Sequence, residues 1–483
     1  MINKLIEKYR NTAAPAKASA WFVISSILVK GTSFITLPVF SRILTTSEYG
    51  IVSVYQSWLA TVSIITTLTL WGGVFNVGMI RFEERKYEMI SSFQGLAVSI
   101  TALFLILSIP VIKYLESVSG MSALLIVCMF IEIIFQVPHN LWATEQRYAY
   151  KYKAIVTISL GSAVVNPILG YLAVINAQNC KAEARIMSAL LVQIAAGAVL
   201  FVVNQYKGRR FFSWEFWKYG FRFNIVLIPH YISTQILSQS DRLMINNMCG
   251  RSDAGIYSVA YNFAMLLSLI TSSINSSLTP YVYQSIKNGN NGLKKRTTAI
   301  VLFVAVITIG IICVVPEFFT FLLPESYYPA LKVIPPVTAA AFFFFVHPLF
   351  ASIEFYYGKN KYVTVASVIG AVFNIILNYI FINIYGFMAA AYTTLFCYIC
   401  FTVCHYLFMK IVLRENGRPN DIYDVHSILL ISAGVLFVTL IMQILYNYIL
   451  IRWAVFLTAL VFGFVFRKRI MSTAKELLKK ETA

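Results

Sequence analysis

Long apolar runs separated by short polar segments dominate the chain. A helix that crosses the hydrocarbon core of a bilayer needs about 20 mostly apolar residues, whereas a barrel strand would give about ten residues of alternating polarity. The runs therefore predict an all-α polytopic membrane protein with about 14 transmembrane helices. The expected spans are residues 18–40, 50–75, 91–112, 121–142, 155–176, 186–204, 219–239, 254–284, 298–315, 333–357, 362–383, 387–409, 427–446 and 450–466.

Composition and charge support this class of protein. Of the 483 residues, 59% are hydrophobic and 12% are charged, which is about half the charged share of a soluble domain. The net charge of +19 comes from short basic clusters between the apolar runs, so we expect no nucleic-acid partner. The richer clusters occupy alternate loops, and the positive-inside rule then predicts an even number of spans with both termini in the cytoplasm.

The two ends of the chain are polar and basic. Residues 1–17 place apolar side chains on one helix face and charged ones on the other, which predicts a segment that lies on the membrane surface. The segment from Arg467 onward predicts a basic cytoplasmic tail. No cleavable signal is apparent. The seven cysteines predict no disulfide framework, although Cys180 and Cys249 fall in loops on the same expected side and could pair.

A segment similar to the start of the chain occurs about 200 residues later, which indicates an internal repeat. At an offset of 200, Lys30 falls on His230 and Ser41-Arg42 on Asp241-Arg242, and after a slip of about five residues Gly50-Ile51 falls on Gly255-Ile256. At an offset of about 208, His139 falls on His347, Asn166 on Asn374, and Glu145 within one residue of Glu354. Each half begins on the same side of the membrane, so the repeat is parallel.

A parallel repeat of six spans predicts two lobes with a central site between them. We expect an N-lobe of residues 1–205 and a C-lobe of residues 206–410. Residues 411–483 would add two further spans and the basic tail.

The sequence offers no catalytic signature. It contains no GxxxxGK[ST], HExxH or GxSxG motif, and no loop is longer than about 18 residues. A membrane enzyme would still need a cluster of acids, a metal site or an external domain. We therefore expect neither an enzyme nor a metal or cofactor site.

Ionisable residues inside the expected spans are the candidates for function. A charge at the bilayer centre costs about 2.5–3.5 kcal/mol on insertion scales, so such a residue usually faces protein or an aqueous cavity. Lys30 lies in the middle of the first span and is expected to contact an anionic ligand. The further candidates are His230, Arg222, His139 and His347 for the substrate, Glu132 and Glu354 for ion coupling or as structural partners, and Arg42, Asp241 and Arg242 for an external gate.

Several of these residues also have a structural interpretation. Arg222 lies near the expected cytoplasmic edge and can extend to lipid phosphates. His139 and His347 adjoin prolines, and both can be hydrogen-bonded residues of the protein interior. Glu132 can be the structural partner of a basic side chain.

The chain also resembles a known family. The segment SRILTTSEYGIVSVYQSW, its echo SDAGIYSVAYNF, the two six-helix halves and the two extra helices are similar to the polysaccharide branch of the multidrug/oligosaccharidyl-lipid/polysaccharide exporters, and most of all to its Wzx type. Lipid II flippases carry an arginine-rich signature in the first helix, which this chain lacks. Drug and cation extruders usually offer carboxylates in the cavity, where this chain offers Lys30 and His230.

The resemblance implies a fold of the multidrug-transporter type and a flippase function. The implied substrate is an undecaprenyl-pyrophosphate-linked oligosaccharide, an O-antigen or capsule unit, moved to the outer leaflet of a bacterial inner membrane by alternating access. The implied partners are this lipid-linked sugar, membrane lipid, and a polysaccharide polymerase with its chain-length machinery. A drug/cation antiporter of the same fold and, more remotely, a polytopic polysaccharide polymerase or ligase remain the alternatives.

Overall fold

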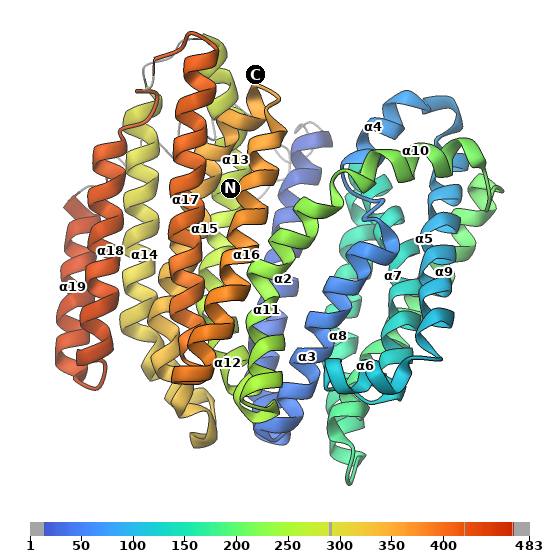
Figure 1. Ribbon diagram of the computed structural model, residues 1–483, viewed down its shortest axis with the longest axis horizontal. Coiled ribbons are helices and arrows are strands. Elements are labelled where there is room, and N and C mark those ends of the chain that lie inside the picture. The colour runs from blue at the N-terminus through green and yellow to red at the C-terminus, as the bar shows by residue number, and fades with distance from the viewer. Residues whose placement is uncertain (1–13, 289–291, 420, 466, 468–483) are drawn as a thin grey trace, which may run out of the picture. The chain divides into compact units, whose positions relative to one another are not determined.

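The structure is a computed structural model that describes residues 14–288, 292–419, 421–465 and 467 (Figure 1). The expected surface helix at the N-terminus falls almost entirely outside these residues, as does the basic tail. The helices of the first half are α2 (Ala14–Ile43), α3 (Thr46–Thr67), α4 (Gly73–Arg81), α5 (Lys86–Ser108), α6 (Ile112–Ser119), α7 (Ala123–Tyr148), α8 (Tyr152–Asn176), α9 (Lys181–Gly208) and α10 (Trp214–Ile225). Those of the second half are α11 (Ile228–Met248), α12 (Arg251–Ala264), α13 (Leu266–Asn288), α14 (Leu293–Leu322), α15 (Ile334–Tyr356), α16 (Asn360–Tyr385), α17 (Ala389–Glu415), α18 (Val425–Leu445) and α19 (Ile449–Val465), with 3-10 turns at Glu83–Arg85 and Glu325–Val333.

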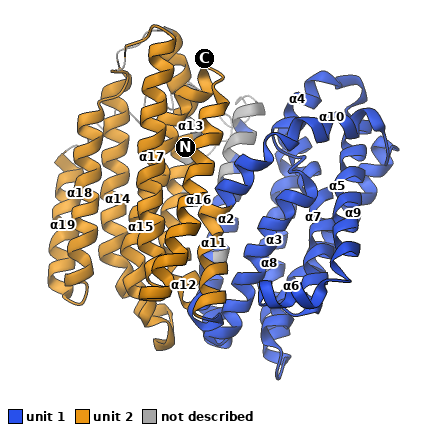
Figure 2. Cartoon of the chain, viewed as in Figure 1, with its two compact units in different colours: residues 1–235, 250–255 blue, residues 236–249, 256–483 orange. Residues whose placement is uncertain are grey.

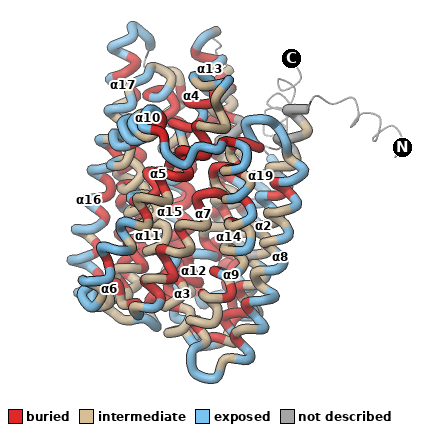
Figure 3. Tube along the Cα trace, turned by 90° about the vertical axis from the view of Figure 1, so that its right-hand side faces the viewer, coloured by how far each residue is buried: buried red, intermediate tan, exposed pale blue. Residues whose placement is uncertain are grey.

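Eleven helical segments among the described residues are long and apolar enough to cross a membrane. The three other expected spans coincide with α3 and α11, which are long but more polar, and with α19, an apolar helix of 17 residues. Large apolar side chains such as Ile106, Val202 and Ile444 are exposed, as expected where lipid is the solvent. Figure 3 shows exposed stretches along helices such as α8 and α16. The predicted class, an all-α polytopic membrane protein, is confirmed.

Three expected spans are interrupted. The second span ends at Thr67, because Leu68 and Thr69 adopt the left-handed conformation with φ values of 53° and 49°, which a helix does not continue through. The eighth is divided at Met265 into α12 and α13. The seventh, expected at 219–239, is divided into the end of α10 and the start of α11.

The chain forms two compact units (Figure 2). The first comprises residues 1–235 and 250–255, and the second comprises residues 236–249 and 256–483. The boundary therefore lies within α11, later in the chain than the boundary expected from the repeat. The C-terminal helices α18 and α19 belong to the second unit, where both pack against α14.

The same order of helix contacts recurs in both halves. In the first unit α7 and α8 both pack against α9, and in the second α15 and α16 both pack against α17. These are the fourth, fifth and sixth spans of each half. Large apolar side chains fill the interior of each unit, among them Phe75 and Phe93 in the first and Phe342 and Phe345 in the second. The repeat read from the sequence thus has a structural counterpart.

Candidate functional site

Lys30 lies in α2, within the candidate membrane span Ile24–Ile43. Its side chain is exposed, as is that of Ser26 one turn earlier. A lysine at this depth is expensive to leave in hydrocarbon. Its expected contact with an anionic ligand stays a prediction. Arg42 is also exposed and occupies the last turn of α2.

The expected match between Lys30 and His230 is wrong. α2 ends at Ile43 and α3 begins at Thr46, while α11 ends at Met248 and α12 begins at Arg251. The two turns have the same length, so no slip of five residues separates the repeats there. Aligned by their helix ends, Lys30 falls on Gln235, and Arg42 falls on Asn247 instead of Arg242.

The glycines of this turn support the corrected register. Gly50 and Gly255 match at the new offset, and both lie in the first unit. A Cβ atom on Gly50 would lie 1.9 Å from the carbonyl oxygen of Arg251, and one on Gly255 would lie 2.0 Å from that of Thr46. Neither position has room for a side chain, so the two glycines make one reciprocal close contact.

His230 and Arg222 are not at mid-span depth. Arg222 is exposed in the last turn of α10, outside the spanning helices. His230 is the third residue of α11 and is half-buried, with its ring centroid 5.8 Å from that of Tyr231. The division of the expected seventh span at Val226 and Leu227 is the physical reason why His230 lies at the start of a helix and not in the middle of one.

Asp241 is the centre of a polar network inside the second unit. Its carboxylate is buried and accepts hydrogen bonds from the Tyr257 hydroxyl (2.6 Å), the Thr394 hydroxyl (2.7 Å) and the Asn378 amide (2.8 Å). Asn378 also donates to Asn374 Oδ1 at 3.3 Å. Three donors on one carboxylate favour its ionised form in a medium that would otherwise exclude a charge.

Arg242 is buried beside this network. Its guanidinium carbon lies 4.3 Å from the centroid of the Tyr261 ring and its Nη1 donates to Gln239. Asp241 and Arg242 are thus held inside the second unit by α12, α16 and α17. Their role in an external gate, with Arg42, stays a prediction.

In the first unit, Glu132 is the predicted acid that lies in a polar network. The Tyr55 hydroxyl donates to Glu132 Oε2 at 2.6 Å, which joins α3 to α7. The Arg185 guanidinium is close enough to act electrostatically on Glu132, and it also stacks on Phe40 at 4.6 Å. Glu132 therefore has a hydrogen-bond donor and a nearby cation.

The remaining candidates lie on α7 and α15. His139 follows Pro138 in α7 and is half-buried. His347 and Glu354 are two turns apart on α15, and Glu354 pairs with His405 of α17.

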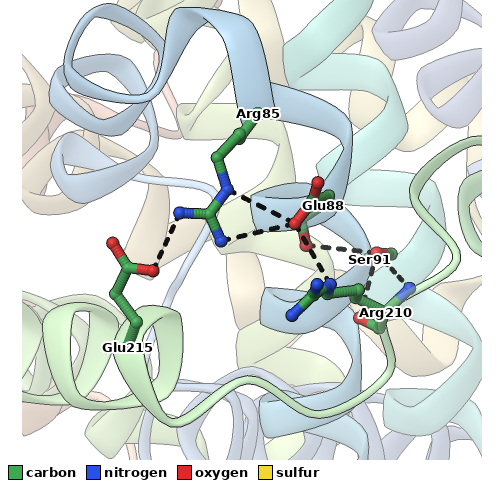
Figure 4. Close-up of polar contacts among 5 residues, drawn as sticks. All are labelled: Arg85, Glu88, Ser91, Arg210 and Glu215. Carbon is green, nitrogen blue, oxygen red and sulfur yellow. Dashed lines mark hydrogen bonds and ion pairs between the residues drawn. The ribbon is translucent and has the colours of Figure 1, made fainter.

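Helix α10, which leads into α11, is fixed to the first unit by a charged cluster (Figure 4). Arg85 donates to Glu215 Oε2 at 2.9 Å and to Glu88 Oε2 at 3.4 Å, while Arg210 Nε lies 3.2 Å from Glu88 Oε2. The Ser91 hydroxyl donates to the Arg210 carbonyl at 3.0 Å. These charges are half-exposed, so each pair contributes little to stability.

Buried contacts anchor α10 more firmly than these charges. Phe216 is fully buried and its ring is 5.1 Å from Phe82. The Asn224 amide is buried and donates to the carbonyls of Leu68 (2.7 Å) and Thr69 (3.2 Å). Asn224 therefore satisfies the backbone of the turn that has positive φ values.

An apolar groove of about 650 Å³ lies between α16 and α17 in the second unit. Its lining includes Leu377, Phe381, Tyr392 and Phe396. The hydroxyl of Thr393, which also lines it, donates to Asn378 in the Asp241 network. The groove offers an apolar chain a large surface.

Several residues of these networks were not among the sequence candidates. Tyr55, Asn378, Thr394 and His405 complete the surroundings of predicted acids. One signal was available: Asn378 follows the repeat-related Asn374 by four residues, hence on the same helix face. The other three come from helices distant in sequence, and only the tertiary fold brings them to their partners.

Comparison with known families and proteins gives the class. A family model described as polysaccharide biosynthesis protein matches residues 16–286, and one described as MatE matches residues 227–380. The chain is 22% identical over 383 residues to Lsg locus putative protein 1 of Haemophilus influenzae, covering 74% of this chain and 88% of that protein. It is 23% identical over 312 residues to the succinoglycan biosynthesis transport protein ExoT of Rhizobium meliloti, covering 62% and 59%.

Solved structures share the fold. The lipid II flippase MurJ in an inward closed conformation has a TM-score of 0.68 at 16% identity, covering 92% of this chain and 100% of that one. An inward-facing multidrug resistance MATE transporter has a TM-score of 0.61 at 12% identity, covering 82% and 98%. With more than half of its length matched by the family model, the chain belongs to the polysaccharide biosynthesis protein family.

Proposed function

We propose that the protein is a flippase for an undecaprenyl-pyrophosphate-linked oligosaccharide, such as an O-antigen, capsule or exopolysaccharide unit. It moves the head group from the cytoplasmic to the outer leaflet of a bacterial inner membrane by alternating access. The family membership supports this proposal. So do the names of two similar proteins, a succinoglycan biosynthesis transport protein and a lipid II flippase.

The observation that carries the proposal is the exposed position of Lys30 within a candidate membrane span. A pyrophosphate crossing the membrane needs a cation at mid-depth, since a bare charge in low dielectric is expensive. Lys30 is the expected partner of the pyrophosphate. A lysine ammonium is a point charge that can release its ligand on either side of the membrane, which suits transport better than the bidentate hydrogen bonds of an arginine.

The other candidates keep secondary roles in this proposal. His230, Arg222, His139 and His347 would contact the sugar or phosphate along the path, Glu132 and Glu354 would act in ion coupling, and Arg42, Asp241 and Arg242 would form the external gate. Both termini would lie in the cytoplasm, as the basic loops favour. Outward movement of one net negative charge gains about 2.3 kcal/mol per 100 mV of an inside-negative potential.

The apolar groove between α16 and α17 supports a substrate with a hydrocarbon chain. Each CH₂ group buried there contributes about 0.8 kcal/mol relative to water, but little relative to lipid. The groove would therefore orient the polyprenyl chain more than bind it. A polysaccharide polymerase would receive the sugar at the outer leaflet.

The test is genetic. In the source bacterium, deletion of the gene should remove one surface glycan and accumulate its lipid-linked repeat unit, and the wild-type gene should restore export. Normal surface glycan in the deletion strain, with no accumulated intermediate, would overturn the proposal.

The second candidate is a drug or cation antiporter. The MatE match over residues 227–380 and the buried carboxylate of Asp241 favour it. It predicts that the deletion strain becomes sensitive to lipophilic cations while its surface glycan stays normal.

A further inference from the structure

A buried acid and two histidines meet where α15 packs against α17. The Nδ1 atom of His405 lies 2.8 Å from Oε1 of Glu354, and the two side chains are 1% and 0% exposed. The other carboxylate oxygen, Oε2 of Glu354, is buried and has no hydrogen-bond partner. An unpartnered carboxylate oxygen in a protein interior is costly and calls for an explanation.

His347 connects this pair to the surface of the unit. Its ring centroid lies 5.6 Å from that of His405, with the Phe401 ring packed against both at 4.7 and 4.5 Å. His347 is only half-buried, although its Nδ1 atom is buried. The cluster is thus a closed pair with one more accessible imidazole beside it.

The charge of the pair follows from its surroundings. An imidazolium and a carboxylate 2.8 Å apart are neutral together, whereas the same pair without its proton leaves a lone carboxylate in a low-dielectric core. Leaving one buried charge unpaired is strongly destabilising. A second proton on His347 would place two imidazolium rings close together without water between them. One proton is therefore the favoured content of the cluster.

We infer that Glu354, His405 and His347 form a proton-binding site of the second unit. The Glu354–His405 pair binds one proton, and His347 is the residue by which this proton exchanges with water. On release, the N–H bond of the His405 imidazolium breaks, its electron pair stays on nitrogen, and the proton passes by His347 to water. A role of this proton in driving transport rests on the proposed function, whereas its binding does not.

The other titratable and charged groups near the cluster do not change its assignment as a proton-binding site. Glu354 acts electrostatically on the thiol of Cys404 in α17. Tyr423 donates to the Leu349 carbonyl, and Tyr283 of α13 stacks on Tyr356. Lys410 of α17 lies over the Tyr406 ring and Arg414 follows one turn later. The ion pairs on neighbouring elements are Lys294 with Asp421, Lys359 with Glu415 and Arg452 with Glu317.

The first half of the chain supplies a matched control. Glu145 is the repeat-related acid, 4% exposed near the end of α7, and its side-chain partner is the Gln146 amide, not an imidazole. Glu145→Gln removes a buried carboxyl at the same repeat position without touching a histidine pair.

The test reads protonation directly. The full-length protein in detergent is labelled with ¹⁵N in its five histidines, and imidazolium and neutral rings are distinguished by their nitrogen shifts at about pH 7.5, where an unperturbed imidazole is mostly neutral. We expect one imidazolium signal, lost in His405→Gln, converted to a neutral ring in Glu354→Gln and unchanged in Glu145→Gln. A neutral His405, or one that stays charged in Glu354→Gln, would overturn the site.

A second measurement covers the case in which Glu354→Gln does not fold. In His405→Gln the proton should move to Glu354, giving an infrared carboxylic acid band that is absent in wild type. The lack of this band would equally overturn the site. Surface glycan of a deletion strain is then compared for the Glu354→Gln and Glu145→Gln variants at lowered proton gradient. If wild type restores no glycan, the proposed function fails, and the nitrogen shifts alone decide the proton site.

Discussion

At the scale of single residues, Asp241 is a buried carboxyl group that accepts three side-chain hydrogen bonds. Three side chains from three helices donate to it. Asp241→Asn replaces one acceptor oxygen by an NH₂ group, which would then face a hydroxyl or amide donor. Each unsatisfied buried group costs about 1–3 kcal/mol, so we expect a clearly lower unfolding temperature in detergent. The control is Asp421→Asn, whose side chain is 69% exposed; equal stability of the two variants would contradict the buried network.

A second prediction at the residue scale concerns the role of Lys30 in export. Lys30→Ala should lower glycan export at least about tenfold at matched membrane abundance, since a phosphate charge left unpaired in a poorly solvated path costs about 3–5 kcal/mol. Lys30→Arg keeps the charge and should keep partial export. The exposed Lys113 provides a control, and Lys113→Ala should export normally. Wild-type export by Lys30→Ala would leave Lys30 without a role.

At the scale of elements, α10 tests which contacts hold a surface helix. Asn224→Ala removes two hydrogen bonds to a turn with positive φ values. It should lower the free energy of unfolding by about 1–3 kcal/mol. Glu215→Ala removes a half-exposed ion pair and should change it by less than about 1 kcal/mol. Thermal unfolding of both variants gives the comparison, and a larger effect of Glu215→Ala would reverse this ranking.

The elements show what an apolar pattern can predict and what it cannot. Long runs such as 155–176 and 362–383 gave helix positions directly, because hydrocarbon allows a spanning chain few other conformations. The breaks at Leu68, Met265 and Val226 were missed. Pro229, in the first turn of α11, was an available signal for the break at Val226. No proline lies near the other two, and the contacts that stabilise the break at Leu68 come from Asn224, a residue distant in sequence.

The candidate site was predicted less well than the fold. Single acids and bases inside spans could be read from the sequence, and Glu132, Asp241 and Glu354 do occupy polar networks. Their partners could not, because each comes from another helix. The match of Lys30 to His230 failed because several alignments of short polar motifs are equally good until the helix ends are known.

At the scale of the whole molecule, orientation follows from the basic loops. A reporter fused after Arg210 or Arg296 should be cytoplasmic, and one at Cys249 should be external, because basic loops are retained on the cytoplasmic side. Cysteine labelling in intact cells gives the same information for Cys249, which is half-buried. An external Arg210 would contradict both the orientation and the even number of spans.

The central claim is that the protein carries a lipid-linked sugar across a membrane. Purified protein is reconstituted in vesicles that contain an undecaprenyl-pyrophosphate oligosaccharide in both leaflets, and an impermeant enzyme that cleaves the sugar is added outside. Without protein, about half of the substrate should stay protected. With wild-type protein the protected half should be cleaved within minutes, and with Lys30→Ala it should stay protected. Protection that is the same with and without wild-type protein would contradict the account.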